Sequence, residues 1–445
     1  MNETTAGRRG PSLRRHWPTG SLAGWLLLFT ALFSLLSALT GLVPALVPGV
    51  LAWAAGALLF RRISRLQRVQ VGVMLAVGLS GLMAAGFEGD GQNFVLNAVG
   101  GSQNLIAMLV AVGFLRLIAE ADNSLTRALP RGRRALWQTL LGTHLFGAAI
   151  NFSALTIIGD RLHAARPLQQ AQALVLSRGF GLASLWSPMF IAMGLALTLA
   201  PSAGLLPVSL GGLAVAVPAV LLTGLLLGHN GKSDTFAGYP MRSDALKLPL
   251  LLVAIVLTGH LLAPGLAITT LITLSALSLP LLALSKRQGV EAAGNRYRRH
   301  IELALPGMAG ELLLFLAAGV LTAGIAAWVE ISGFELHLAH FGATEAAGLV
   351  ALSGIAAVIG VHPLITLSSC AGMLLPVADS PELLALACLM SWSLGVIVSP
   401  CSGMHLAMQG RFSISGYRLM AWNWRFCLLL FVLDVAVLQL FERLL

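Results

Sequence analysis

Charged side chains are scarce in this sequence. Asp, Glu, Lys and Arg make up 10% of its 445 residues, whereas 57% are hydrophobic and the mean hydropathy is +0.85. Soluble globular domains carry about 25% charged residues. The shortage excludes a water-soluble chain, and apolar runs long enough to cross roughly 30 Å of hydrocarbon recur along the sequence. We therefore predict an all-α, polytopic membrane protein.

Cysteine is also rare, and its spacing does not suit a metal site. The four cysteines are Cys370, Cys388, Cys401 and Cys427, all within apolar stretches and without paired metal-ligand spacing. We interpret them as small buried hydrophobic residues and expect no metal or cofactor. A glycine-rich, phosphate-cradling loop is missing as well, which argues against ATP-driven transport by this chain alone.

The few charges are mainly positive, and the formal net charge is +10. Arginines cluster in short loops beside apolar runs, where they orient helices and contact anionic headgroups, so we predict no nucleic-acid partner. By the positive-inside rule, the basic leader at residues 1–20 places the N-terminus in the cytoplasm of a bacterial cell. The number of crossings then places the C-terminus in the periplasm, in a multi-pass protein of the inner membrane.

We expect about eleven transmembrane helices and two re-entrant hairpins. If residues 139–159 crossed fully, the basic loop around Lys286 and Arg299 would lie outside, against the charge rule, and a hairpin removes this conflict. The predicted organisation has five parts: leader 1–20; N-terminal helices 21–92; repeat 1 at 93–228, with a hairpin at about 139–159 and a broken helix at about 181–200; linking helices and loops 229–300; and repeat 2 at 301–445, with a hairpin at about 348–375 and a broken helix at about 383–409.

The two halves resemble each other at nearly constant offsets. The matched positions are Ser187-Pro188 with Ser399-Pro400, 212 residues apart; Asn151 with His362, 211 apart; and Gly113 with Gly319, 206 apart. An odd number of crossings between the copies makes them inverted. Inverted repeats that each carry a discontinuous helix are typical of secondary transporters. The alternative is that the Ser-Pro pairs are ordinary kinks in long helices.

Small polar and helix-breaking residues at the breaks and hairpin tips are candidate ligands for a solute or ion. Proline removes a backbone donor and frees carbonyl groups, and a half-helix N-terminus favours an anion. The candidates are Asn151, Ser153, Ser187, Pro188, His362, Pro363, Ser399, Pro400, Ser402 and Gly403, with Cys401 beside them. We expect them to meet near the centre of the membrane.

Three ionisable residues in apolar segments are candidates for proton coupling. They are Glu311, His362 and His405. Intramembrane ionisable groups are commonly functional, but each of these has an alternative as a packed side chain hydrogen-bonded to a neighbouring helix. Arg178, just before the first broken helix, either pairs with a substrate carboxylate or extends to lipid headgroups.

This layout resembles the ion transporter superfamily, which includes divalent-anion/sodium symporters, citrate and arsenite carriers, and the membrane subunit of tripartite dicarboxylate transporters. The resemblance covers roughly residues 93–440 as an arrangement of segments. It implies a homodimer, an elevator movement of the hairpin domain, and tips at 151–153 and at His362-Pro363. The dicarboxylate symporters have Ser-Asn-Thr at both tips, whereas this chain has Asn151-Phe152-Ser153 and His362.

The sequence therefore predicts a secondary active transporter, and not an enzyme, for a small anionic solute such as a carboxylate or oxyanion. Symport with H⁺ or Na⁺ would drive it. Three alternatives stay open: a membrane-embedded enzyme that uses Ser402 and His405, a channel or non-transport membrane scaffold, and an exporter rather than an importer.

Overall fold

The computed structural model describes residues 18–88, 91–121, 129–229, 234–240, 247–333, 338, 340–374, 377–378 and 380–444. Residues 1–17, which hold most of the predicted basic leader, lie outside the described residues. The regular secondary structure of the described residues is helical. These residues also form two isolated β-bridges but no β-strand. The predicted all-α class is confirmed, and the chain is a multi-pass membrane protein.

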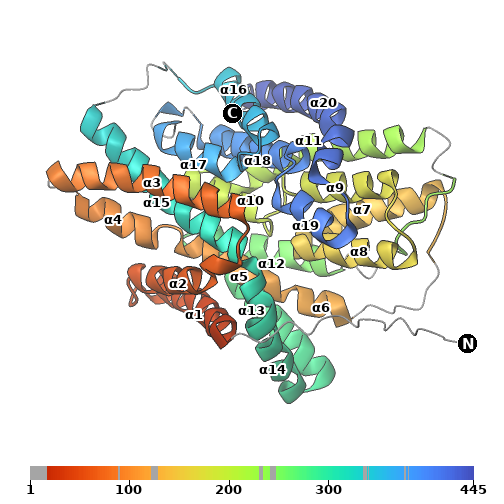
Figure 1. The fold of residues 1–445 in the computed structure, drawn as a ribbon, viewed down its shortest axis with the longest axis horizontal. Coiled ribbons are helices and arrows are strands. Elements are labelled where there is room, and N and C mark those ends of the chain that lie inside the picture. Colours follow the sequence, from red (N-terminus) through yellow and green to blue (C-terminus); the bar gives the residue numbers. More distant parts are fainter. Residues whose placement is uncertain are drawn as a thin grey trace, which may run out of the picture.

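The helices follow one another in a fixed order along the chain (Figure 1). They are α1 (Pro18–Thr40), α2 (Leu46–Leu59), η1 (Phe60–Arg62), α3 (Arg65–Glu88), α4 (Gly91–Gly100), α5 (Gln103–Phe114), α6 (Arg116–Ala121), α7 (Arg133–Ile150), α8 (Phe152–Ala165), α9 (Gln170–Ala183), α10 (Ile191–Leu199), α11 (Leu205–Gly228), α12 (Lys247–Leu262), α13 (Ile268–Gln288), α14 (Val290–Arg299), η3 (His300–Ala304), η4 (Leu305–Met308), α15 (Ala309–Ser332), α16 (Ala343–Val358), α17 (Pro363–Leu374), α18 (Pro381–Val398), α19 (Gly403–Phe412) and α20 (Gly416–Glu442).

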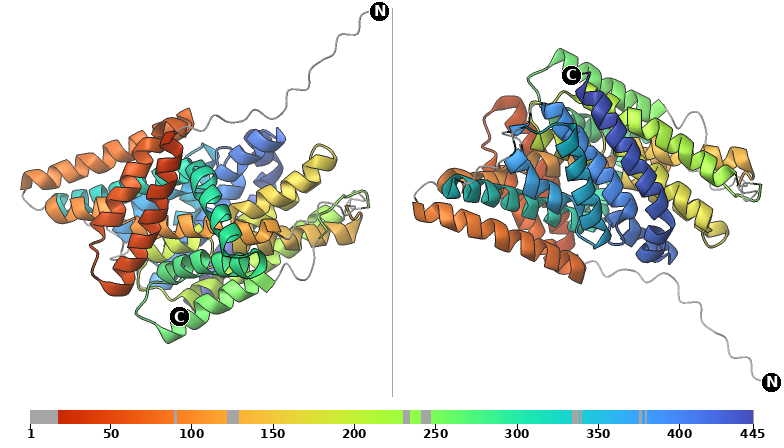
Figure 2. Two further views of the ribbon diagram at one scale, coloured as in Figure 1. Left: turned by 90° about the horizontal axis from the view of Figure 1, so that it is seen from below. Right: turned by 90° about the horizontal axis from the view of Figure 1, so that it is seen from above.

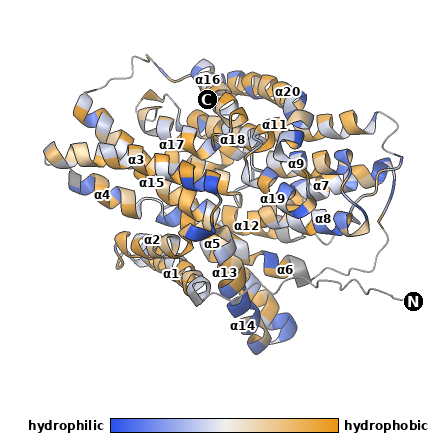
Figure 3. Ribbon diagram, viewed as in Figure 1, coloured by the Kyte–Doolittle hydropathy of each residue, from blue (hydrophilic) through white to orange (hydrophobic). Residues whose placement is uncertain are grey.

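Within the described residues, eight helical spans are long and apolar enough to cross a membrane. They correspond to eight of the eleven predicted crossings. The other three predicted crossings are α2, which has 14 residues, α12, which has 16, and the interrupted pair α9 and α10. Hydrophobic residues cover most helices, and hydrophilic ones gather on α14 (Figure 3).

The helices form two packed groups. In the first, α1 packs on α2 and α5, α13 packs on α5, and α15 packs on α3 and α4. In the second, α7 packs on α9, and α18 packs on α16, α20 and α10. The first group lies on one side of the molecule and the elements from α7 to α11 lie toward the other (Figures 1 and 2). We call these the α3–α15 group and the hairpin group.

Glycines hold α3 and α15 at unusually short range. A Cβ atom added at Gly81 would lie 2.0 Å from the carbonyl oxygen of Gly324, and one added at Gly324 would lie 2.0 Å from the carbonyl oxygen of Gly78. In a membrane, helices associate through such close packing of small residues, because lipid tails are as apolar as the side chains. The glycines therefore make α3 and α15 the tight centre of their group.

The same order of elements occurs twice. A helix, a helical hairpin, a broken helix and a last helix form α5 to α11, and the same series forms α15 to α20. The second helix of each hairpin also contacts the second half of the other repeat's broken helix: α8 contacts α19, and α17 contacts α10. This crossed contact pattern relates the two repeats in space as well as in sequence.

Two boundaries differ from the sequence prediction. The first broken helix begins at Gln170 rather than near residue 181, and the first hairpin runs from Arg133 to Ala165 rather than from 139 to 159. The sequence prediction starts the first broken helix too late because polar residues before residue 181 belong to helical turns. Gln169 and Gln172 form a reciprocal cap at the start of α9, so a polar stretch that suggested a loop is helical.

Candidate functional site

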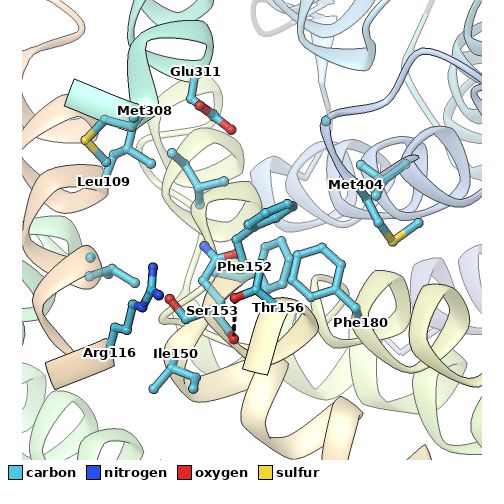
Figure 4. Close-up of a pocket in the computed structure, with 18 of the residues that line it drawn as sticks. Leu109, Arg116, Ile150, Phe152, Ser153, Thr156, Phe180, Met308, Glu311 and Met404 are labelled. Carbon is cyan, nitrogen blue, oxygen red and sulfur yellow. Dashed lines mark hydrogen bonds between the residues drawn. The ribbon is translucent and has the colours of Figure 1, made fainter. Parts of the chain in front are cut away.

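A cavity of about 400 Å³ lies where the two hairpin tips approach the α3–α15 group (Figure 4). Residues of α5, α6, η3, η4 and α15 line one side, and both hairpin tips, the broken helices and α19 line the other. Its size suits a small-molecule ligand, since such pockets start at roughly 300 Å³. The cavity therefore joins the two repeats at one place.

The tip of the first hairpin is built around Asn151. Its φ is 50° and its ψ is −132°, a conformation that favours glycine and that asparagine tolerates better than most residues. This turn ends α7 and starts α8, and no side chain caps the start of α8. Phe152 and Ser153 line the cavity, and Thr156 donates a hydrogen bond to the Ser153 carbonyl. The positive end of α8 thus faces the cavity.

The tip of the second hairpin is formed by Gly360 and His362. Gly360 has a φ of 96°, and His362 Nδ1 accepts a hydrogen bond from the Leu364 backbone N–H at 3.2 Å. An accepting Nδ1 leaves the proton of a neutral imidazole on Nε2, where it can be donated. The ring lies edge-on to Trp392, with 5.6 Å between the ring centroids. His362 therefore caps α17 and offers a donor at the cavity.

Glu311 supplies a carboxylate to the lining. It lies in the first turn of α15, next to the irregular turns η3 and η4. A Cβ atom added at Gly403, the first residue of α19, would lie 3.9 Å from Glu311 Oε1. Ser402 caps α19 by accepting from the His405 N–H. The carboxylate thus faces the positive end of α19, which stabilises negative charge.

Basic side chains stand at two edges of the cavity. Arg116 extends from α6 toward the tip of the first hairpin (Figure 4). Arg411, at the end of α19, forms a two-pronged ion pair with both carboxylate oxygens of Asp160 on α8. Arg116 and the positive end of α8 give this part of the lining the character of an anion site, whereas Arg411 and the positive end of α19 face Asp160 and Glu311.

His300 adds a buried polar atom to the same wall. Its ring packs on Phe114 with 4.5 Å between centroids, and its Nε2 has no hydrogen-bond partner in the part of the chain that the structure describes. The residue begins a π-helical stretch, His300–Ala304, and such stretches are frequent at functional sites. The unpaired nitrogen is itself buried within this wall of the cavity.

Apolar and aromatic side chains form the rest of the lining. The aromatic members are Phe152, Phe180, Phe190, Phe315 and Trp392. Rings from α8, α9, α15 and α18 thereby enclose the polar groups. A ligand that matches this surface has an anionic group and an apolar or aromatic body.

The cavity brings together part of the predicted site. Asn151, Ser153, His362, Gly403 and Glu311 line it. The remaining predicted residues, Ser187, Pro188, Pro363, Ser399, Pro400, Ser402 and His405, do not appear among the lining residues. The tips and the start of α19 are therefore at the cavity, whereas the two Ser-Pro breaks lie behind it.

The serines of the breaks bond to the backbone around them. Ser187 Oγ donates to the Ala148 carbonyl of α7 and accepts from the Met189 N–H at 3.2 Å. Ser399 Oγ accepts from the Cys401 N–H at 3.3 Å. In both breaks, therefore, the serine hydroxyl accepts a hydrogen bond from the backbone N–H two residues later. These hydroxyls stabilise the interruptions of the two helices.

Three other candidates have partners of their own. His405 Nδ1 lies 2.6 Å from the Ser399 carbonyl, and Pro363 packs against Gly395. Arg178 neither reaches the cavity nor extends to the surface. It is 5% exposed, its Nε donates to Asn423 Oδ1 at 2.9 Å, and its guanidinium lies over the Phe426 ring.

Sequence reasoning missed Arg116, His300 and Arg411. Arg116 lies within the first apolar run of predicted repeat 1, and a charge in an apolar run is a signal of function. His300 follows the basic end of α14, and Arg411 lies seven residues before Arg418. Nothing local in the sequence separates them from residues that contact lipid headgroups.

No family model matches the sequence, and no curated protein matches it. Several solved structures are similar, two of which are MtrF and YdaH. MtrF of Neisseria gonorrhoeae, described as representing a class of antimetabolite efflux pumps, is 13% identical, and the match covers 83% of this chain and 94% of MtrF with a TM-score of 0.51. The YdaH transporter of Alcanivorax borkumensis is 15% identical over 79% of this chain and 88% of YdaH, with a TM-score of 0.42. At such identity, the likeness to MtrF shows a shared fold.

Proposed function

We propose that this chain is a secondary transporter that carries a small organic anion through the cavity between the two hairpin tips. The cavity itself carries the proposal: it joins the Arg116 guanidinium, the N-terminus of α8 and aromatic walls at the meeting point of two related repeats. A carboxylate or similar anionic group fits the polar side, and an apolar or aromatic body fits the rest. The solute class is therefore an amphipathic organic anion.

Efflux is the direction that the comparison favours. MtrF is described as an efflux pump, and its fold matches 83% of this chain. Direction in a secondary transporter follows from the coupling gradient. Exchange of H⁺ for solute needs titratable groups, and Glu311, His362 and His300 line the cavity. We propose H⁺ as the coupling ion.

Further parts of the proposal follow from the repeat architecture. We expect the hairpin group to move against the α3–α15 group in an elevator-type step, with the chain as a homodimer in a bacterial inner membrane. Similarity to the ion transporter superfamily stays a prediction. The enzyme alternative gains no support, because Ser402 and His405 bond to backbone atoms of their own break, outside the cavity lining.

A reconstituted assay tests this function. Purified protein in liposomes should exchange radiolabelled benzoate, a small aromatic carboxylate, for unlabelled organic anions. Arg116→Gln should lower exchange about tenfold or more, because a charge-assisted contact contributes about 1.5–3 kcal/mol. Arg287→Gln, at an exposed arginine at the end of α13, is the matched control and should exchange normally.

Two results would contradict the proposal. One is no exchange with any aromatic or aliphatic carboxylate, sulfonate or phosphonate in a screen with folded protein. The other is full exchange by Arg116→Gln, which would leave transport in place and remove the cavity as its route.

A further inference from the structure

The membrane interior holds a second carboxylate, outside the cavity lining. Asp434 on α20 is 0% exposed, and neither of its oxygens has a hydrogen-bond partner among the described residues. An isolated carboxylate in such an environment is strongly unfavourable, so a proton or another cation must neutralise it. Asp434 is not among the residues that line the cavity.

Two serines without partners lie at the same depth. Ser353 on α16 and Ser391 on α18 are both 0% exposed, and neither hydroxyl has a partner in the described part of the chain. The helices α16 and α18 start side by side, because Phe341 pairs with the Val377–Ala378 segment just before them. Each serine comes ten residues after the first residue of its helix, which places both roughly 15 Å below that end.

Contacts farther along the two helices agree with this register. A Cβ atom added at Gly395 of α18 would lie 3.5 Å from the Cβ of Ala357 on α16. Ser353 and Ser391 each precede these residues by four positions, one helical turn along the same face. The two hydroxyls therefore lie on the facing sides of α16 and α18.

The end of α20 fixes the level of Asp434. Glu442, at the last turn of α20, accepts a hydrogen bond from the Ala343 N–H, which starts α16. Asp434 precedes Glu442 by eight residues, roughly 12 Å along the helix. Since α20 packs on both α16 and α18, the carboxyl and the two serines lie within about one helical turn of the same level.

The charged and titratable groups around α20 have other partners or lie at other levels. Arg178 of α9 bonds to Asn423, which is eleven residues or roughly 16 Å from Asp434 along α20. Glu442 and Glu345 cap the start of α16, Glu382 of α18 bonds to the Gly204 N–H, and in α19 His405 and Arg411 bond to Ser399 and Asp160. Cys388 of α18 and Cys427 of α20 are free and buried, and α11 carries no titratable residue.

We propose that Asp434, with Ser353 and Ser391, forms a proton-binding site between α16, α18 and α20, separate from the solute cavity. The proton bonds to a carboxylate oxygen of Asp434, and the two serine hydroxyls are the unpaired polar groups at the same level of the neighbouring helices. Three oxygen groups are too few to replace the hydration shell of Na⁺, because the backbone carbonyls of these helices already bond within their helices. The site binds and releases H⁺ during transport. This role in transport, unlike the binding of the proton itself, rests on the proposed function.

Infrared spectroscopy tests the site without any solute. The wild-type protein should show the C=O stretch of a protonated, buried carboxyl group at neutral pH. Asp434→Asn should remove this band, whereas Asp160→Asn, at the carboxylate paired with Arg411, should leave it unchanged. A spectrum unaltered by Asp434→Asn would overturn the proposal, whatever the outcome of transport assays.

A coupling assay in liposomes tests the role of the proton. Asp434→Asn should keep benzoate exchange but lose benzoate movement driven by an imposed pH gradient, and a pH-sensitive dye inside the vesicles should no longer report proton flux. A structural role alone would leave coupling intact, because asparagine has the shape of the protonated acid. Ser391→Ala is a milder second variant that should slow coupled flux. Normal coupling in both variants would refute the role.

Discussion

Asn151 has a backbone conformation that most residues avoid. Its φ of 50° turns the chain from α7 into α8 at the edge of the cavity. A strained backbone of this kind costs about 1–3 kcal/mol for an unsuitable side chain and is typical of binding sites. The residue thus serves the fold of the hairpin as well as the polarity of its tip.

We expect Asn151→Val to lower the free energy of unfolding by about 1–3 kcal/mol, because a β-branched residue fits poorly at positive φ. Asn151→Gly should cost less than the valine variant, since glycine accepts this conformation. Asn97→Val, at an exposed position of α4, is the control. Thermal unfolding in detergent measures all three. Equal melting temperatures for the valine and glycine variants would contradict the argument.

Whether a site residue could be predicted from the sequence depended on how unusual its side chain is for the segment around it. Asn151 and His362 stand out because each is a polar residue in a long apolar run, and both line the cavity. Asp434 stands out equally in the sequence, yet only the packing of α20 shows that its carboxyl lacks a partner. Arg178 has a side chain suited to binding an anion, but it bonds to Asn423, which lies 245 residues away in the sequence. No local sequence pattern reveals a partner at that separation.

At the scale of elements, the helix that follows each break contacts it through glycine. A Cβ atom at Gly212 of α11 would lie 1.8 Å from the Leu185 carbonyl in the first break. One at Gly416 of α20 would lie 2.1 Å from the Pro400 carbonyl in the second. Both interruptions therefore rest against a neighbouring backbone, which holds their shape.

Alanine at either glycine should destabilise the protein. We expect Gly212→Ala and Gly416→Ala each to cost about 1–3 kcal/mol, because the added methyl group overlaps a backbone carbonyl that cannot rotate away. Gly348→Ala in α16 meets open space and should be neutral or stabilising by up to about 1 kcal/mol. Melting temperatures would decide, and a loss at Gly348 as large as at Gly212 would argue against specific contacts.

The order of elements was largely predictable. Apolar runs mark the helices, Ser-Pro pairs mark the breaks, and the charges of the loops indicate the side of the membrane on which each loop lies. Boundaries were less so. The structure starts the first broken helix at Gln170, where polar residues make a helical cap, and the sequence signal began at residue 181. The π-helical stretch His300–Ala304 has no sequence signature comparable to a proline, so the wall that it gives the cavity was not foreseen.

At the scale of the whole molecule, two side-chain hydrogen bonds join the α3–α15 group to the second hairpin. Gln70 of α3 donates from Nε2 to the Gly360 carbonyl at the tip of the second hairpin, at 3.0 Å. Thr322 of α15 donates to the Ser368 carbonyl of α17 at 3.2 Å. If the hairpin group moves during transport, these hydrogen bonds must break.

Gln70→Leu should therefore change the rate of transport more than the affinity for solute. Loss of the bond to Gly360 should lower the barrier to movement by about 0.5–1.5 kcal/mol, a rate increase of about twofold to tenfold. Initial rates in liposomes over a range of solute concentrations separate kcat from KM. Gln92→Leu, at an exposed position of α4, is the control. A higher KM at constant kcat would mean that Gln70 acts on binding instead.

The hydrogen bond between Arg178 and Asn423 also constrains how the protein is made. Arg178 belongs to the first broken helix, but its partner is in the last helix, α20. At about 5–20 residues per second of synthesis, the ribosome needs roughly 10–50 s to supply the missing partner. During that interval the guanidinium must stay hydrated near the membrane surface or be shielded by an insertion chaperone. Final burial of α9 therefore waits for α20, so that a helix of the second repeat completes the packing of the first.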